Sequence, residues 1–206
     1  MAENSISIFA GPSFSLKQDI KSRTFDENGN RTNVKVLTSQ TSLRFKEGAK
    51  WTHFFPNNFG IEGEFFHGEV LSSIDTTSDG NVDTGLKQDR FSFMLLFVFR
   101  QKASRFKISS IYEGMGAGGI YSDFEGIGRE LGYGGQFFSG LNFDGRGNFF
   151  IEAKYIWTPD VGGGNTSPGT HLKSSGNPQN NLATHLFGPH HDTQILSLVL
   201  GTRFKL

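Results

Sequence analysis

The chain has 206 residues, 20 acidic and 20 basic side chains, and no cysteine. A chain without net charge has no overall field to attract nucleic acid, so a nucleic-acid partner is not expected. The absence of cysteine excludes a disulfide framework, a thiolate metal site and a cysteine nucleophile. Phenylalanine and glycine are frequent, at 22 and 27 residues, and this composition favours strands and turns over helices.

The length predicts a single domain over residues 1–206. The longest apolar run covers residues 93–99, which is too short for a membrane-spanning helix. A membrane β-barrel stays open, because its signal is alternation and not continuous apolarity. The first residues, "MAENSISIF", lack the charged and apolar regions of a signal peptide. We therefore expect that a signal peptide has been removed and that Met1 is an added initiator.

Alternation with a period of two dominates the chain. Apolar residues occupy one face, and small or polar residues the other, in seven segments: "SISIFAGPSFSL", "FGIEGEFFHGEV", "RFSFMLLFVFR", "FKISSIYEG", "GYGGQFFSGLNF", "FFIEAKYIW" and "TQILSLVLGTRF". Each is predicted to be a strand. An eighth strand lies within "NVKVLTSQTSLRF", where the apolar residues change phase, and this predicts a bulge or a register break. The segment that follows, "KEGAKWTHFFPNN", fits either a long turn or a continuation of this strand.

The connections between these strands alternate in length. Long connections rich in Gly, Asn, Asp, Ser and Thr cover residues 17–32, 75–88, 122–131 and 159–192, whereas "QKASR" and "DGRG" are tight. The sequence therefore predicts an all-β fold: an eight-stranded antiparallel up-and-down transmembrane β-barrel with four longer extracellular loops and short periplasmic turns. Both termini are then expected on the periplasmic side.

The two faces of the strands differ in volume and charge. The apolar faces carry more than ten Phe together with Tyr112, Tyr133, Tyr155 and Trp157, which is too much volume for the interior of an eight-stranded barrel. We therefore expect these apolar faces to contact lipid, with Tyr133, Tyr155 and Trp157 forming an interfacial belt. The opposite faces predict a balanced charge network in the lumen, made of Glu62, Glu64, Arg100, Lys107, Glu113, Glu152, Lys154 and Arg203. A soluble surface with the same balance is the alternative.

The second half of the chain resembles small bacterial outer-membrane barrels of the OmpA-like and opacity-protein type. The resemblance rests on "IYEGMGAGGIYSD", "GYGGQFFSGLNFDGRGNFFIEAKYIW" and "QILSLVLGTRF", which are similar to the last four strands of that family. It implies a Gram-negative outer-membrane location, contact with outer-membrane lipids and lipopolysaccharide, and recognition of the C-terminal strand by the barrel-assembly machinery. Members usually end on an aromatic residue, whereas this chain continues from Phe204 to Lys205 and Leu206, which we expect to derive from a cloning vector.

This resemblance implies a non-enzymatic barrel that anchors in the outer membrane and displays surface loops for a structural, adhesive or ligand-binding role. Three alternatives stay open: a narrow pore or small hydrophobic-ligand channel, a lipid-A-modifying enzyme, and a soluble lipocalin-like carrier. None of the six histidines is followed two residues later by serine, so the nucleophile arrangement of a barrel deacylase is absent. His67 and Glu69 come closest, without a serine beside them.

Two further motifs resemble binding sites. His185, His190, His191 and Asp192 could ligate a divalent metal, but they end the longest polar loop, so neither a metal nor a cofactor is expected. Gly114, Gly116 and Gly119 match a dinucleotide fingerprint, yet no amphipathic helix follows them, and such a site needs one. We expect Gly114, Gly116 and Gly118 to continue the outward face of the strand that contains Tyr112.

Overall fold

The computed structural model describes the two ends of the chain and the strands between them. The described residues are 2–25, 31–38, 43–74, 84–103, 108–124, 128–143, 148–158 and 190–206. Side chains are described for residues 2–16, 44–69, 89–103, 108–123, 131–143, 148–158 and 194–206. In this part of the chain, no helix is long and apolar enough to cross a membrane.

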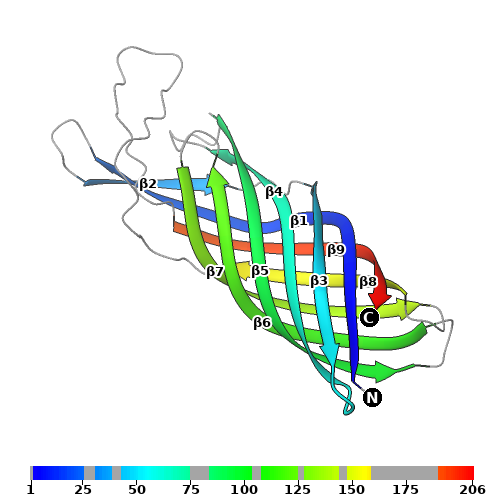
Figure 1. Ribbon diagram of the computed structural model, residues 1–206. Helices are drawn as coiled ribbons and strands as arrows, with labels where there is room; N and C mark the ends of the chain where they lie inside the picture. Colours follow the sequence, from blue (N-terminus) through cyan, green and yellow to red (C-terminus); the bar gives the residue numbers. More distant parts are fainter. Residues whose placement is uncertain are drawn as a thin grey trace.

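The described residues form one closed antiparallel barrel (Figure 1). Its strands are β1 (Glu3–Phe25), β2 (Arg31–Thr38), β3 (Leu43–Phe54), β4 (Phe59–Ile74), β5 (Thr84–Lys102), β6 (Ile108–Phe124), β7 (Gly128–Phe143), β8 (Phe149–Thr158) and β9 (His190–Lys205). Each strand pairs with its neighbour in the chain from β3 to β9, and β1 pairs with both β3 and β9. The predicted fold class, an all-β antiparallel barrel with eight strand positions, is confirmed.

Strands β2 and β3 share the eighth position of the barrel. β3 pairs with the first half of β1, and β2 pairs with the second half, where Gln18 lies opposite Thr38 and Phe25 opposite Arg31. The predicted break in this strand therefore falls between Thr38 and Leu43. The segment after it continues as strand β3, and the only turn within it is a tight one at residues 55–58, where Asn58 has a φ of 68°. Asparagine tolerates this left-handed conformation better than most residues.

Several strands extend into segments that the sequence predicted as loops. Residues 17–25 belong to β1, residues 84–88 to β5, and residues 122–124 and 128–131 to β6 and β7. These expectations were wrong because strands pair through backbone hydrogen bonds, which do not require apolar side chains. In β6 and β7, for example, the pairing continues until Phe124 lies opposite Gly128. A polar sequence hides such an extension, since no apolar face marks it.

The strands are tilted relative to the barrel axis. A line followed across the pairs from Ser5 through Thr52, Glu62, Leu96, Gly116, Gln136, Ile156 and Ile195 returns to β1 at Ser15. The stagger of ten residues per circuit, from Ser5 to Ser15, gives the tilt that closes a small barrel. Both termini lie at one end of the barrel, here called the terminal end (Figure 1).

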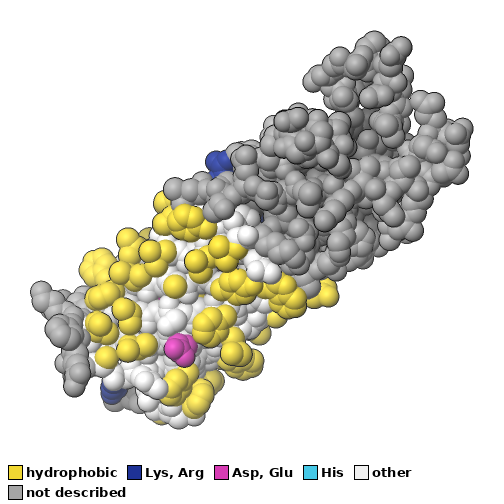
Figure 2. Space-filling view, turned by 180° about the vertical axis from the view of Figure 1, so that it is seen from behind, with side chains coloured by type: hydrophobic (Ala, Val, Ile, Leu, Met, Phe, Trp, Pro, Cys, Tyr) yellow, Lys and Arg dark blue, Asp and Glu magenta, His cyan; other side chains and the backbone are white. Residues whose placement is uncertain are grey.

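The outward face of the barrel is apolar. Phe93, Phe97 and Leu95 on β5 are more than half exposed, as are Phe45, Phe65, Phe149 and Leu200 on other strands. Figure 2 shows hydrophobic side chains spread over one side of the described wall, with few charged groups among them. The predicted orientation is therefore correct for most strands, including Tyr133 and Trp157, which are 60% and 46% exposed.

Strand β6 is the exception to the predicted orientation. Tyr112 is buried in the interior, with 1% of its surface exposed, and Glu113 is exposed on the outward face. A β-bulge between Ile108 and Ser110 adds one residue to β6 relative to β7, and one extra residue exchanges the two faces of a strand. Gly114, Gly116 and Gly118 accordingly share the inward phase of Tyr112, which corrects their predicted outward position.

The interior is packed with aromatic rings that lie over glycines. In the described chain every buried aromatic residue is directly opposite a glycine on a neighbouring strand: Phe9 and Phe66 opposite Gly48, Phe54 opposite Gly60, Tyr112 opposite Gly140, Phe138 opposite Gly114, and Phe150 opposite Gly201. A Cβ on Gly140 would lie 2.6 Å from Cζ of Tyr112. The glycines therefore leave the volume that these rings fill.

Candidate functional site

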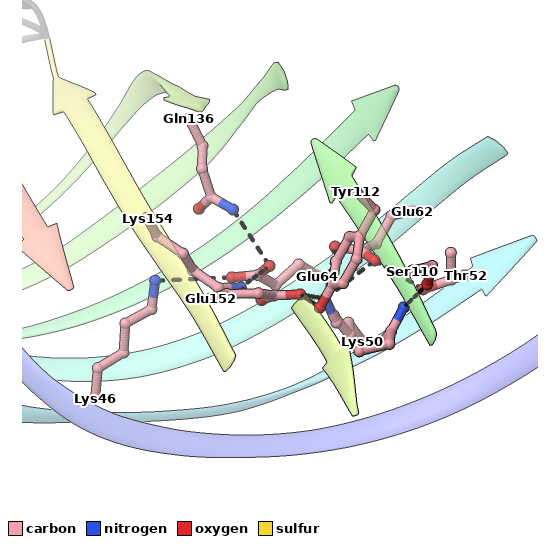
Figure 3. A network of polar contacts seen from close by, with 11 residues as sticks. Lys46, Lys50, Thr52, Glu62, Glu64, Ser110, Tyr112, Gln136, Glu152 and Lys154 are labelled. Atoms are coloured by element: carbon pink, nitrogen blue, oxygen red, sulfur yellow. Dashed lines mark hydrogen bonds and ion pairs between the residues drawn. The ribbon is translucent and has the colours of Figure 1, made fainter. Parts of the chain in front are cut away.

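The most conspicuous polar feature of the barrel is a chain of six buried charges in its interior (Figure 3). It alternates lysine and glutamate in the order Lys46, Glu64, Lys154, Glu152, Lys50 and Glu62. The members come from β3, β4 and β8, and none has more than 2% of its surface exposed. We call this set the lumen charge chain.

The contacts along the lumen charge chain are direct ion pairs. Nζ of Lys154 lies 2.9 Å from Oε2 of Glu152 and also contacts Glu64, while Nζ of Lys50 lies 3.2 Å from Oε2 of Glu62 and also contacts Glu152. Lys46, at one end of the lumen charge chain, makes a longer contact: its Nζ lies 3.7 Å from Oε1 of Glu64. Three positive and three negative charges cancel within the chain, which is the condition under which buried charges are tolerated.

Neutral side chains supply further hydrogen bonds to the carboxylates. The Tyr112 hydroxyl donates to Oε1 of Glu152 at 2.6 Å, and the Thr52 hydroxyl donates to Oε2 of Glu62 at 2.7 Å. Nε2 of Gln136 donates to Oε2 of Glu64 at 3.2 Å. Each of the three glutamates thus has a neutral donor besides its lysines, and such bonds to charged groups are among the stronger ones in proteins.

The interior aromatic rings surround the lysine ammonium groups. Nζ of Lys46 lies 3.4 Å from the centroid of the Phe66 ring, and Nζ of Lys154 lies 4.2 Å from that of Phe9. Lys50 lies 4.7 Å from the centroid of Phe150. Contact with the negative face of a ring stabilises a cation that has lost its water. The rings thus both fill the interior and solvate the lysines.

A second polar contact lies near the terminal end. Nη1 of Arg100 donates to Oε2 of Glu3 at 2.9 Å, and its guanidinium lies 4.0 Å from the centroid of the Phe54 ring. Lys205 also approaches Glu3, with Nζ 3.8 Å from Oε1. Arg203 lies farther from the terminal end than Lys205, and its guanidinium is 5.3 Å from the centroid of the Tyr112 ring.

The structure places the predicted lumen residues in three groups. Glu62, Glu64, Glu152, Lys154 and Arg203 are buried in the interior, and Arg100 is partly buried beside Glu3. Glu113 lies on the outward face instead, opposite Phe99 and Ser139, because the bulge in β6 changes its phase. Lys107 lies outside the described residues.

The weak metal candidates of the sequence are not tested by the structure. His185 lies outside the described residues, and only the backbone of His190, His191 and Asp192 is described, as the start of β9. Among the described residues no group of three or more His, Asp or Glu is arranged to hold a metal ion.

Three residues with side chains in this polar network were not predicted to face the lumen: Lys46, Lys50 and Thr52. All three lie in the segment that the sequence left open between a turn and a strand. The signal was present, because Lys46, Lys50 and Thr52 alternate with Phe45, Ala49 and Trp51. Glu47 interrupted this apolar face, and its outward position is confirmed by a side chain that is 66% exposed. One outward carboxylate was enough to hide the period.

In the described interior, the three glutamates are paired with lysines. Of the histidines, His53 and His67 have described side chains, and both lie outside the lumen. The lumen charge chain is neutral and the described interior is packed, because the charges of the chain cancel and the buried side chains from Phe54 to Ile195 are each 6% exposed or less.

Comparison with known proteins identifies the fold. No family model and no curated protein sequence matches this chain. OprG, an outer membrane protein of Pseudomonas aeruginosa, matches over 97% of this chain and 95% of its own, with 13% identity and a TM-score of 0.53. Ail, the attachment invasion locus protein of Yersinia pestis, solved in complex with the heparin analogue sucrose octasulfate, matches over 98% and 99% with 18% identity and a TM-score of 0.43.

Neisserial surface protein A matches over 98% of this chain and 97% of its own, with 8% identity and a TM-score of 0.49. The structural likeness to OprG, with a TM-score of 0.53 at 13% identity, shows a shared fold and not a shared activity. The resemblance expected from the strand pattern is confirmed at that level. The chain has the fold of the small outer-membrane β-barrels, as represented by OprG.

Proposed function

We propose that this chain is a non-enzymatic barrel that anchors in the outer membrane of a Gram-negative bacterium and displays its surface loops there. The observation that carries the proposal is the pairing of an apolar outer wall with a packed interior whose lumen charge chain is neutral. Such a barrel is stable in a lipid bilayer and does not conduct ions. Its function therefore lies in the segments that it holds at the membrane surface.

The outer wall supports the membrane location. In water, exposed Phe, Leu and Ile over a whole barrel would form an apolar patch far larger than soluble monomers tolerate. In lipid, the same wall is the expected surface. We infer that outer-membrane lipids and lipopolysaccharide cover it, and that the assembly machinery recognises β9.

The contents of the lumen distinguish an anchor from a pore. A pore needs a continuous aqueous path, whereas the described interior holds three ammonium groups within ion-pair distance of three carboxylates, packed between phenyl rings. A lipocalin needs an open cavity for its ligand, whereas rings and ion pairs fill the interior that the described residues form. The loops, including residues 159–192, are the regions that we propose bind an extracellular ligand.

Gel migration of the unboiled protein tests the membrane barrel. We expect the detergent-purified protein to migrate faster in SDS before boiling than after it, because a closed barrel stays folded in cold SDS. A boiled sample is the control for the unfolded position. Solubility without detergent, together with no shift on boiling, would favour the soluble carrier.

Electrical recording tests the sealed interior. In planar bilayers we expect no steady conductance from the inserted protein, whereas a fixed open-channel current would favour the narrow pore. Lipid A extracted from cells that express the protein should keep its mass. A loss or gain of an acyl chain would favour the enzyme.

Protease treatment of intact cells tests the display of loops. Cleavage is expected within residues 159–192 while both termini stay protected, as detected by terminal epitope tags. Protection of this segment, with cleavage of the tags, would contradict the proposed orientation.

A further inference from the structure

Arg203 is a buried arginine near the terminal end that has no acidic partner among the described side chains. It is 3% exposed, and its Nε and Nη2 atoms donate no hydrogen bond. A buried polar atom without a partner is unfavourable, and a buried charge without one is more so. A ligand that brings both an acceptor and a negative charge would remove this cost.

The backbone holds Arg203 at the point where β9 passes the start of β8. Its backbone N–H donates to the carbonyl oxygen of Asn148 at 2.6 Å. Its guanidinium carbon lies 5.3 Å from the centroid of the Tyr112 ring and 5.6 Å from that of Phe150. Nζ of Lys50 lies 5.5 Å and 4.7 Å from the same two centroids. Arg203 is therefore next to the lumen charge chain without belonging to its ion pairs.

The terminal mouth of the barrel holds more positive than negative charge. Among the described side chains, Glu3 is the one carboxylate in this mouth, and its Oε2 already accepts a hydrogen bond from Arg100 at 2.9 Å. Its Oε1 lies 3.8 Å from Nζ of Lys205, a residue that we expect to be vector-derived and therefore leave out of the balance. Arg100 and Arg203 thus share one carboxylate, which leaves one positive charge without compensation.

Arg100 and Arg203 reach the same part of the interior from different strands. Arg100 on β5 lies directly opposite Tyr112 on β6, whose ring approaches the Arg203 guanidinium. Nε of Arg100 also has no hydrogen-bond partner, and neither has the hydroxyl of Ser7, which lies opposite Arg203 on β1. The side chains of Arg100 and Glu3 are 16% and 28% exposed, so the mouth is accessible from the terminal end.

The charge of this mouth distinguishes between possible ligands. Water accepts hydrogen bonds from these donors but leaves the positive charge in place, whereas an anion does both. A guanidinium presents parallel N–H donors that match two oxygens of a phosphate or a carboxylate. Phe204, the next residue on β9, is 54% exposed on the outer wall. Arg203 therefore lies where the apolar wall ends and the phosphate-bearing head-group layer begins.

We propose that the terminal mouth binds one phosphate-type oxyanion, held by Arg203 and Arg100. A free phosphate and the phosphate of a lipid head group offer the same chemistry, so the experiment has an arm for each. The site goes beyond the proposed anchoring role, and it does not require the outer wall to face lipid.

A titration with inorganic phosphate tests the site. The protein is kept in a nonionic detergent at constant ionic strength, and the phosphorus NMR line width of the phosphate is followed. We expect saturable broadening that fits a single site. A line width that the folded protein leaves unchanged throughout the titration would overturn the proposal.

Matched variants separate a built site from general charge attraction. Arg203→Gln is expected to weaken phosphate binding at least about tenfold, because hydrogen bonds to a charged group are lost. Arg203→Lys keeps the charge without the forked donors and should bind with intermediate affinity. Lys102→Gln removes the same charge from an exposed position at the same end and should change the affinity less than about threefold. Equal losses for Arg203→Gln and Lys102→Gln would refute the site.

Urea unfolding gives a readout that a purely structural arginine would not give. Without phosphate, Arg203→Gln should unfold at the same or a higher urea concentration than the unmodified protein, because it removes an uncompensated buried charge. Saturating phosphate should raise the midpoint of the unmodified protein and leave that of the variant unchanged. A variant that is equally destabilised with and without phosphate would contradict the proposal.

Dihexanoyl phosphatidylglycerol, added below its micelle-forming concentration, is the lipid arm. Displacement of inorganic phosphate by this lipid supports a head-group source, and binding of inorganic phosphate alone supports a free ion. Heat-modifiable migration shows whether each variant is folded. If the protein inserts as a barrel but binds no phosphate, this proposal fails and the anchor proposal stands. If it binds phosphate at Arg203 but stays soluble without detergent, the anchor proposal fails and the site stands.

Discussion

Glu152 lies in the middle of the lumen charge chain. It contacts Lys50 and Lys154 and accepts a hydrogen bond from Tyr112. If this carboxylate lost its charge, the buried chain would hold three ammonium groups and only two carboxylates. The stability of the interior therefore depends on single residues, because an uncompensated buried charge is far more costly than a paired one.

Neutralising Glu152 should destabilise the barrel. We expect Glu152→Gln to lower the free energy of unfolding by about 3 kcal/mol or more, the range for breaking one side of a buried ion pair. Urea unfolding in lipid vesicles measures this. Glu113→Gln removes the same charge from the outward face, where a charge is unfavourable in lipid, and should not lower this free energy. Similar losses for the two variants would contradict the buried network.

The Tyr112 hydroxyl makes a smaller, separable contribution. Tyr112→Phe keeps the ring over Gly140 and removes the hydrogen bond to Glu152, so a loss of about 1.5–3 kcal/mol is expected for a bond to a charged group. In the double variant with Glu152→Gln, the two effects should not add, since both act on one contact. Full additivity would show that the hydroxyl acts elsewhere.

The strands are built from pairs of an interior ring and an opposing glycine. Gly140 leaves space for Tyr112, and Gly48 leaves space for Phe9 and Phe66. A glycine weakens a strand by itself, but the ring that lies over it restores packing and covers the backbone. This pairing explains why a narrow barrel holds so many rings and charges together.

Adding a methyl group at an interior glycine should disturb this packing. Gly140→Ala places Cβ within 2.8 Å of Cγ of Glu152 as well as near the Tyr112 ring, so we expect a loss of about 1–3 kcal/mol in unfolding free energy. Gly63 has no atom within 4 Å of such a Cβ. Gly63→Ala should therefore be close to neutral or slightly stabilising, and an equal loss at both positions would refute the proposed ring–glycine packing.

At the scale of the whole molecule, closure between β1 and β9 creates the fold. The two strands pair along most of their length, with Ile8 opposite Thr202 and Ala10 opposite Leu200. Among the described strands, closure gives every strand except β2 a partner on both sides, and β2 pairs only with β1. Such pairing is how a sheet satisfies its backbone in lipid. Closure also fixes the stagger that tilts every strand.

Cysteine pairs can report this closure, because the chain has no cysteine of its own. Directly opposite residues lie within the Cα separation that a disulfide needs. We expect Ile8→Cys with Thr202→Cys to form a disulfide in the folded protein, as measured by loss of free thiols. Ile6→Cys with Leu200→Cys is four residues out of register and should stay reduced. Cross-linking of the second pair would show a different register.

The sequence alone predicted the barrel class and the outward face of most strands. Period-two alternation in "RFSFMLLFVFR" and "FFIEAKYIW" is a local property, since successive residues of any strand point to opposite sides. The volume of the phenylalanines then decided which face is outside. The burial of Glu62, Glu64, Glu152 and Lys154 follows from the same phase.

The tertiary structure decided what depends on two strands at once. The bulge that reverses β6 is defined only against β7, so Tyr112 and Glu113 could not be assigned from "IYEG". The alternating order of the lumen charge chain joins β3, β4 and β8, which are far apart in sequence and meet only across the closed interior. Alternation determines which side a residue faces, and closure determines which residues it meets there.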